Sequence, residues 1–141
     1  RIHDEVGARV VGSDLNSHAC RRARDAGIEA VRADLVDPFR DAVFDVVTFN
    51  PPYLPADAAA ARDDWMEVAL TGGDTGRAVI DPFLDSVGRV LAPDGDVLLL
   101  VSTLTGVDEV VERAGERGFS SVVVDETSFP YETLVVLKLV R

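Results

Sequence analysis

The stretch that decides the fold is Asp45-Val46-Val47-Thr48-Phe49-Asn50-Pro51-Pro52-Tyr53. From Phe44 to Phe49 the chain is almost continuously apolar, which is typical of a strand buried in a parallel sheet. The two prolines then begin a long loop, which is predicted to run to about Gly76. The sequence therefore predicts a buried parallel strand that leads directly into a stiff loop.

Segments on both sides of this stretch alternate between strand and helix patterns. Gly27 and Gly118 each end a predicted helix, and Pro93-Asp94-Gly95 is predicted to form a turn. Strands are expected at residues 9–13, 28–33, 97–101, 121–125 and 134–140, and helices at residues 17–26, 77–91 and 107–117. The last two strands are joined by a short segment, which suits an antiparallel pair. This order predicts an α/β, Rossmann-like fold, with a mostly parallel sheet, helices on both faces and an antiparallel C-terminal strand.

The whole chain, residues 1–141, is expected to form a single domain that lacks its N-terminal portion. Residues 1–7 look like the tail of a helix, whereas a doubly wound nucleotide-binding sheet normally starts with a strand and a Gly-rich turn. No such turn occurs in the sequence. The longest apolar runs are strand-sized and no signal segment is recognisable. We therefore expect a cytoplasmic protein without a membrane-spanning segment.

Cysteine and histidine are too few for a disulfide or a metal site. Cys20 is the only cysteine, and His3 and His18 are isolated, so no metal is predicted. Cys20 is interpreted as a small residue packed on a helix rather than as a reactive thiol.

The charge of the chain is strongly acidic. The net charge is -11, 17 of the 25 acidic residues are Asp, and Lys138 is the only Lys among 14 basic residues. An Asp-rich surface with almost no Lys suggests, as a hypothesis, a protein from a salt-rich cytoplasm. The absence of a basic cluster argues against direct nucleic-acid binding, although high salt would weaken such a signal in any case.

Two acidic residues stand at the ends of successive predicted strands. Asp14 ends the first strand and is followed by Leu15, and Asp34 ends the second and is followed by Leu35. Carboxylates at the carboxyl ends of such strands face a ligand crevice, where they can accept hydrogen bonds from ribose hydroxyls and from an exocyclic amine. The alternatives are an N-cap for Asp14 and a turn for Asp34. Two acids on the same edge favour cofactor binding.

The loop Asn50-Pro51-Pro52-Tyr53 is the most specific chemical signal. Two prolines stiffen the backbone, and the residue before them is held extended. The Asn50 side-chain oxygen and the Pro51 carbonyl can then accept from one NH2 group, while Tyr53 stacks on a planar group. Such a site suits a nitrogen whose lone pair is delocalised, and catalysis by positioning. The alternative is a Pro-rich turn.

At this point the chain resembles a known family. The arrangement of Asp14, Asp34 and Asn50–Tyr53 is similar to that of the class I S-adenosylmethionine-dependent amino-methyltransferases. Within that class the chain resembles the HemK-related protein-glutamine methyltransferases, in the archaeal and eukaryotic branch that modifies the class 1 release factor. The resemblance covers nearly the whole chain and rests on residues 34–36, 50–54, 69–77, 80–81 and 132–138.

The resemblance implies a function, a cofactor and a partner. It implies N5-methylation of the glutamine in the Gly-Gly-Gln loop of the release factor, with Asn50, Pro51, Pro52 and Tyr53 as catalytic residues. S-adenosylmethionine would contact Asp14, Leu15, Asp34, Leu35 and Asn50. Members of this branch work with a small zinc-binding activator subunit, which adds a strand to the sheet edge, here at residues 28–33. The missing Gly-rich turn leaves the methionine-side contacts outside this chain.

Two other functions stay open at this level. One is an N-methyltransferase that acts on an exocyclic amine of adenine or another base in RNA or DNA, because the four-residue loop is shared with such enzymes. The other is a scaffold subunit that has lost cofactor binding. Three local roles also stay open: Trp65 shapes a substrate entrance or packs its loop, Gly72 and Gly73 allow close backbone approach or form a plain turn, and Arg77 contacts the release factor or caps local carbonyls.

Overall fold

The computed structural model describes residue 5, residues 7–53 and residues 72–141. The chain divides into two compact units, Arg1–Phe39 and Arg40–Arg141, and each is described here by itself. The predicted helical tail at residues 1–7 falls almost entirely outside the described residues, as do Trp65 and most of the long loop after Tyr53.

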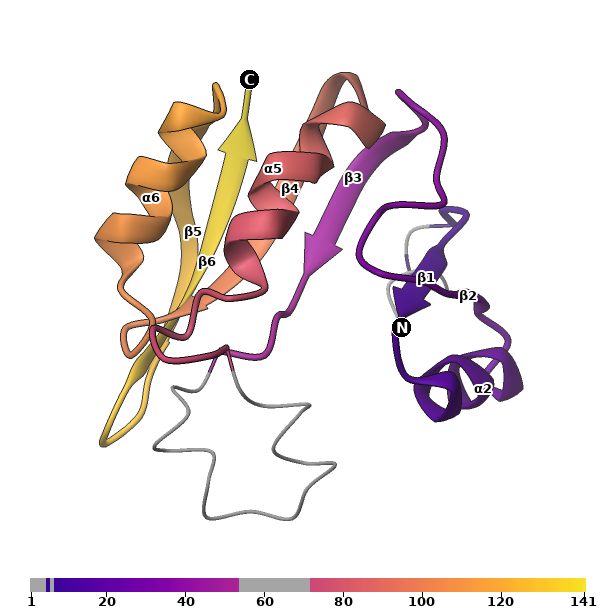
Figure 1. Cartoon of the computed structure of the whole chain (residues 1–141), viewed down its shortest axis with the longest axis horizontal. Helices are drawn as coiled ribbons and strands as arrows, with labels where there is room; N and C mark the ends of the chain where they lie inside the picture. Colours follow the sequence, from indigo (N-terminus) through magenta and orange to yellow (C-terminus); the bar gives the residue numbers. More distant parts are fainter. Residues whose placement is uncertain (1–4, 6, 54–71) are drawn as a thin grey trace. The chain divides into compact units, whose positions relative to one another are not determined.

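From residue 7 onward, the first unit contains a pair of parallel strands and a helix. It consists of β1 (Val11–Asp14), α2 (Ser17–Asp25) and β2 (Glu29–Arg32) (Figure 1). Val11 lies opposite Glu29 and Asp14 opposite Arg32, so both strands run in the same direction. The predicted strands and helix are confirmed: β1 begins two residues later and ends one residue later than predicted, and α2 and β2 are a residue or two shorter. Gly27 follows the helix with the positive φ of 82° that glycine tolerates.

An exposed ion pair joins the starts of the two strands. Arg9 Nη2 lies 2.9 Å from Glu29 Oε2. The hydrogen bond from Arg9, reinforced by its positive charge, lowers the pKa of the Glu29 carboxyl. Because both side chains are largely in water, the pair contributes little to the stability of the fold.

Within its described residues, the second unit contains a four-stranded mixed sheet and two helices. Its elements are β3 (Phe44–Phe49), α5 (Ile80–Val90), β4 (Leu91–Ser102), α6 (Val107–Glu116), β5 (Ser120–Ser128) and β6 (Thr133–Val140). The strand order is β3-β4-β6-β5. β3 is parallel to β4, whereas β6 is antiparallel to both β4 and β5. The predicted antiparallel finish is therefore confirmed.

The core of this unit lies between the sheet and the two helices. Figure 1 shows α5 and α6 on the same face of the sheet. Alternate residues of β4 and β6 are buried because side chains of a strand point to opposite faces, and the buried helix residues recur every three or four positions. The aromatic rings of Phe49 and Phe83 have centroids 4.2 Å apart. The buried set includes Ile80, Phe83, Leu84, Val87, Val97, Leu99, Val101, Val110, Leu137 and Leu139.

Two predictions for this sheet need correction. β3 was expected to be buried, yet Asp45, Val46 and Thr48 are exposed, because among the described residues β3 pairs with β4 alone. β4 begins at Leu91 instead of residue 97, and its pairing passes from Phe44–Leu91 directly to Val46–Asp96. The predicted turn at residues 93–95 therefore loops out between two paired stretches of one strand.

Helix ends and strand lengths differ from prediction in smaller ways. α5 begins at Ile80 instead of residue 77, because the preceding residues are held in a turn in which the Ala78 amide donates to the Gly72 carbonyl at 2.8 Å. β5 continues to Ser128, three residues beyond its predicted end. No helix within the described ranges is long and apolar enough to cross a membrane.

Candidate functional site

The two predicted acidic positions lie at one edge of the first unit. β1 and β2 are parallel, so their carboxyl ends meet at the same edge of the strand pair. Asp14 is the last residue of β1, and Asp34 follows β2 by two residues. The Ala33 amide donates to the Asp14 carbonyl at 3.0 Å, which continues the pairing beyond the strand ends.

Side-chain hydrogen bonds between the two strand ends hold this edge together. The Ser13 hydroxyl donates to the Leu35 carbonyl at 2.8 Å. The Arg32 guanidinium donates to the Leu15 carbonyl at 3.0 Å. Leu35 has a φ of +51°, uncommon for a residue with a side chain. The structure thus brings together the four residues predicted in this part of the cofactor site, Asp14, Leu15, Asp34 and Leu35.

Asp14 is not the N-cap of the following helix, which was the alternative to cofactor binding. Its Oδ1 accepts from the Asn16 amide at 2.7 Å. The N-cap of α2 is Asn16, whose own Oδ1 accepts from the His18 amide at 2.9 Å. Asp14 therefore does not cap the helix, and its exposed carboxylate is set in place by the turn that precedes α2.

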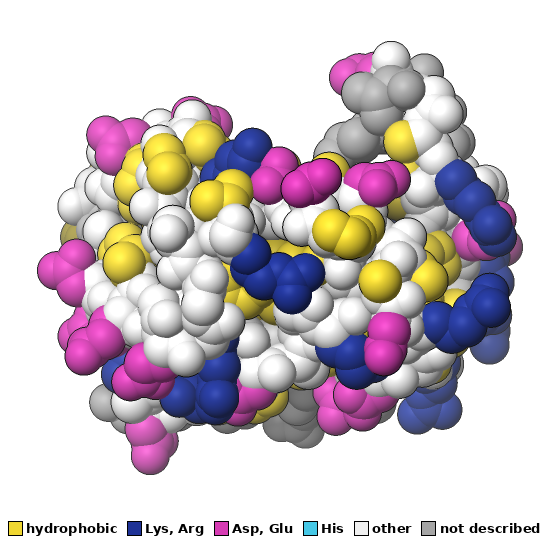
Figure 2. All heavy atoms as spheres, turned by 90° about the horizontal axis from the view of Figure 1, so that it is seen from above, with side chains coloured by type: hydrophobic (Ala, Val, Ile, Leu, Met, Phe, Trp, Pro, Cys, Tyr) yellow, Lys and Arg dark blue, Asp and Glu magenta, His cyan; other side chains and the backbone are white. Residues whose placement is uncertain are grey.

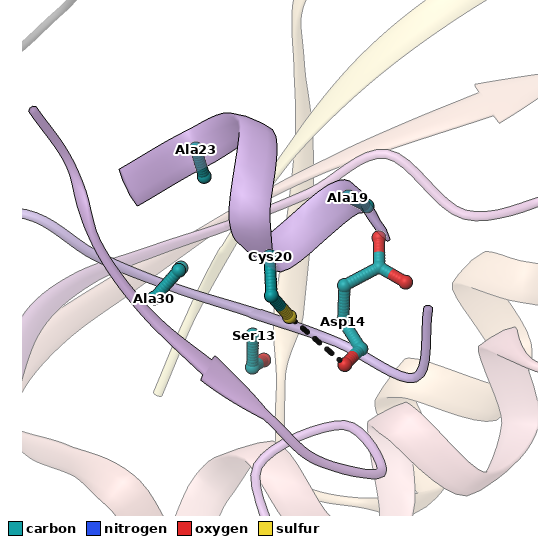
Figure 3. A pocket seen from close by; sticks show the side chains of 7 residues that line it. Ser13, Asp14, Ala19, Cys20, Ala23 and Ala30 are labelled. Carbon is teal, nitrogen blue, oxygen red and sulfur yellow. Dashed lines mark hydrogen bonds between the residues drawn. The ribbon is translucent and has the colours of Figure 1, made fainter. Parts of the chain in front are cut away.

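A shallow pocket of about 140 Å³ lies between α2 and the two strands (Figure 3). Cys20 is only 2% exposed, and its thiol donates to the carbonyls of Asp14 and Val31, both at 3.4 Å. The interpretation of Cys20 as a packed residue is confirmed. Most of the lining residues are small, which lets the helix approach the strands closely: Gly12, Ser13, Asp14, Ala19, Cys20, Ala23 and Ala30.

The loop Asn50–Tyr53 follows β3 directly in the second unit. Asn50 is exposed, Pro51 is buried, and Pro52 and Tyr53 are half-buried. The Tyr53 carbonyl accepts from the Thr105 hydroxyl at 3.1 Å. Thr105 was not singled out from the sequence. The available signal was its place just after a strand parallel to β3, because the carboxyl ends of parallel strands share an edge.

The segment Gly72–Arg77 packs against the same loop. Gly73 has a φ of +73°, and a Cβ on Gly72 would collide with the backbone of Gly76, so both glycines serve the close approach that was one of the two roles considered. Arg77 Nη1 donates to the Thr105 carbonyl at 2.6 Å. Arg77 therefore donates to a carbonyl 28 positions away along the chain instead of to the carbonyls of its own turn.

Several basic side chains in the second unit pair with carboxylates. Asp85 lies 3.1 Å from the Arg113 guanidinium and 2.6 Å from that of Arg117, which links α5 to α6. Lys138 lies 2.8 Å from Asp96. On the face seen in Figure 2, acidic and basic side chains are interspersed.

The predicted site residues thus form two groups in two units, Asp14–Leu15 with Asp34–Leu35, and Asn50–Tyr53 with its supports. Within the described residues, no group of three His, Cys, Asp or Glu side chains could hold a metal ion. An exposed carboxylate pair beside a strand edge and a stiff, anchored loop can bind a polar ligand and orient a planar group.

Solved structures with the same fold are methyltransferases. A Pyrococcus furiosus methyltransferase superposes with a TM-score of 0.67 at 15% identity, over 98% of this chain and 66% of that one. A Burkholderia thailandensis N1-methyltransferase, solved with bound S-adenosylhomocysteine, gives 0.61 at 17% identity, over 99% and 64%. The chain therefore has the class I S-adenosylmethionine-dependent methyltransferase fold, as predicted.

More similar proteins narrow the class. The E. cuniculi Mtq2–Trm112 complex, described as responsible for methylation of the eRF1 termination factor, contains a chain with a TM-score of 0.78 and 34% identity, over 99% of this chain and 77% of that one. A putative protein N5-glutamine methyltransferase from Methanocaldococcus jannaschii is 31% identical over 139 residues. The match covers 94% of this chain and 70% of that protein. The chain belongs to the protein N5-glutamine methyltransferase family.

The human methyltransferase HEMK2 is a further relative, 28% identical over 140 residues. This match covers 97% of the chain but 64% of the human protein, so the chain spans about two thirds of the length of these relatives. No family profile matches the chain.

Proposed function

We propose that this chain carries the reaction centre of an S-adenosylmethionine-dependent protein-glutamine N5-methyltransferase, whose substrate is the Gln of the Gly-Gly-Gln loop in the class 1 release factor. The observation that carries the proposal is the loop Asn50–Tyr53, which leaves the carboxyl end of β3 and is anchored at its far end by Thr105. Membership of the glutamine methyltransferase family supports the choice of an amide over a nucleobase.

In this proposal the loop recognises the substrate amide. The exposed Asn50 side chain and the Pro51 carbonyl accept from the two N–H groups of the amide, and Tyr53 stacks against its plane. This arrangement leaves the nitrogen lone pair directed at the methyl donor, so catalysis comes from positioning. The methylated nitrogen then loses a proton to solvent, and no dedicated general base is required.

The edge at Asp14 and Asp34 fits the proposed cofactor, S-adenosylmethionine. The exposed carboxylate of Asp14 can accept from ribose hydroxyls, and Asp34 can accept from the adenine amine. Leu15 and Leu35 border the same edge, where the hydrogen bonds from Arg32 and Ser13 fix their carbonyls. In the proposed reaction the cofactor would supply an electrophilic methyl group to the substrate amide nitrogen that Asn50 and Pro51 hold, and it would leave as S-adenosylhomocysteine.

The proposed activator subunit would add a strand beside β2, within residues 28–33. Among the described residues β2 pairs with β1 and with no other strand. The Ala30 carbonyl accepts hydrogen bonds from the Arg24 guanidinium at 3.0 and 2.7 Å. A backbone amide of an added strand could replace Arg24 as the donor to this carbonyl. Trm112 occupies the partner role in the E. cuniculi complex, and we propose a small zinc-binding protein of that kind here.

The proposal is tested with the full protein, co-expressed with the activator subunit and supplied with labelled S-adenosylmethionine. Purified release factor, tRNA and rRNA are offered side by side, and the label is mapped by mass spectrometry. We expect label on the Gly-Gly-Gln glutamine. Asn50→Ala should lower the rate at least about a hundredfold at saturating cofactor, because the loss falls on positioning of the amide.

Two results would contradict the proposal. Label on RNA alone would favour the alternative, an N-methyltransferase that acts on an exocyclic amine of a base. Absence of both label and cofactor binding would favour a scaffold subunit.

A further inference from the structure

Thr105 is buried in the turn that follows β4. The residue is only 1% exposed, and its backbone amide donates to the Ser102 carbonyl at 2.9 Å. Because β4 is parallel to β3, this turn lies at the same edge of the sheet as the loop that leaves β3. A polar side chain at such a buried position needs a hydrogen-bond partner.

The partner of Thr105 is the far end of the Asn50–Tyr53 loop. The Thr105 hydroxyl donates to the Tyr53 carbonyl at 3.1 Å, across 52 positions of sequence. Pro51 and Pro52 stiffen the segment that ends at Tyr53. The hydrogen bond from Thr105 therefore fixes the far end of a stiff segment.

Thr105 is itself held in place from a second direction. Arg77 Nη1 donates to the Thr105 carbonyl at 2.6 Å, a charge-assisted hydrogen bond stronger than a neutral one. Gly76 lies against the Tyr53 carbonyl and the Thr105 side chain. A Cβ on Gly76 would be 2.7 Å from the Tyr53 carbonyl oxygen and 3.3 Å from the Thr105 side chain. The Tyr53 carbonyl is thereby confined between a donor and a close-packed backbone.

We propose that Thr105 is a positioning residue for methyl transfer. It fixes the Tyr53 end of the loop, so that Asn50, Pro51 and Tyr53 present their acceptors and ring in one arrangement. The inference rests on the proposed function of the loop, yet it concerns a residue outside the Asn50–Tyr53 motif. In this proposal Arg77 acts through Thr105.

The test compares variants that keep or remove the hydroxyl. Thr105→Val preserves the shape of the side chain, and Thr105→Ser preserves the donor. Thr103→Val is the matched control, because the Thr103 hydroxyl oxygen accepts from the Thr133 amide at 3.0 Å and serves the neighbouring hairpin instead of the loop. The methylation kinetics are measured with the full protein and its activator, at a temperature well below the unfolding transition of every variant.

We expect Thr105→Val to lower kcat about tenfold with an unchanged KM for the cofactor, because small misplacements at a reacting centre are costly. Thr105→Ser and Thr103→Val should keep kcat within about twofold of wild type. The proposal is overturned if Thr105→Val keeps wild-type kcat, if Thr103→Val loses as much, or if Thr105→Ser does not restore the rate.

A second measurement separates this inference from the proposed function. Amide hydrogen exchange is followed in the peptide that spans residues 44–53, without any methyl acceptor. Faster exchange in Thr105→Val than in Thr103→Val and wild type would support the anchor even if glutamine methylation were not found. Equal exchange in the three proteins would overturn it.

Discussion

The packing around the Asn50–Tyr53 loop requires a glycine at position 76. Its φ of +76° lies in the region that favours glycine, and the space where a Cβ would stand is filled by the Tyr53 carbonyl oxygen. Gly118 has a similar φ of +84°, but nothing lies within 4 Å of its would-be Cβ. A side chain added at Gly118 therefore meets only the unfavourable backbone conformation, whereas one added at Gly76 also meets a steric clash.

Gly118→Ala should destabilise the protein by about 1–2 kcal/mol, the cost of a side chain in the left-handed region. Gly76→Ala should cost about 1–3 kcal/mol more, because the added methyl group also overpacks the loop. Urea unfolding of both variants measures the difference. Equal destabilisation would show that the contact with Tyr53 is relaxed at no cost.

At the scale of elements, β4 organises the second unit. It pairs with β3 on one side and β6 on the other, and its alternate residues differ sharply in burial. Leu99 is fully buried beneath the helices, whereas its neighbour Leu98 is half-buried on the opposite face. The period of two in a strand produces this contrast, and the carboxyl end of the same strand positions Thr105.

Leu99→Ala should lower the free energy of unfolding by about 2–5 kcal/mol, because it leaves a cavity in close-packed surroundings. Leu98→Ala removes the same atoms from a half-exposed site and should cost about 1 kcal/mol. Chemical denaturation of the two variants measures both values. A larger loss for Leu98 would mean that its face of the sheet is the better packed one.

At the scale of the whole molecule, charge is the dominant feature. The net charge of -11 on 141 residues opposes compaction through self-repulsion. Ion pairs such as those of Asp85 with Arg113 and Arg117 leave this net charge unchanged, because every Arg and Lys is already counted in it. Salt screens the net charge, since the Debye length falls from about 10 Å at 0.1 M to about 3 Å at 1 M.

The temperature of thermal unfolding should therefore rise as KCl is increased from about 0.1 to 1 M. The control repeats the titration near pH 4.4, where the net charge is close to zero and the salt effect should shrink. An unfolding temperature that is independent of KCl at neutral pH would contradict the role assigned to self-repulsion.

Local patterns in the sequence were enough to place most elements. β3 has the bounds that its apolar run predicted, and α6 begins at the predicted residue and is followed by Gly118. These features depend on side-chain periodicity and on glycine conformation within a few neighbouring residues. The same is true of Asn50–Tyr53, whose stiffness is a property of its own two prolines.

Contacts between distant residues were decided only by the tertiary structure. The Thr105–Tyr53 and Arg77–Thr105 hydrogen bonds span 52 and 28 positions, and no periodicity encodes them. The exposure of β3 and the looped-out turn in β4 likewise depend on which strands pair and in what register. Register follows from the packing of whole faces against each other, so the sequence indicated where the Asn50–Tyr53 loop begins, and the fold determined what anchors it.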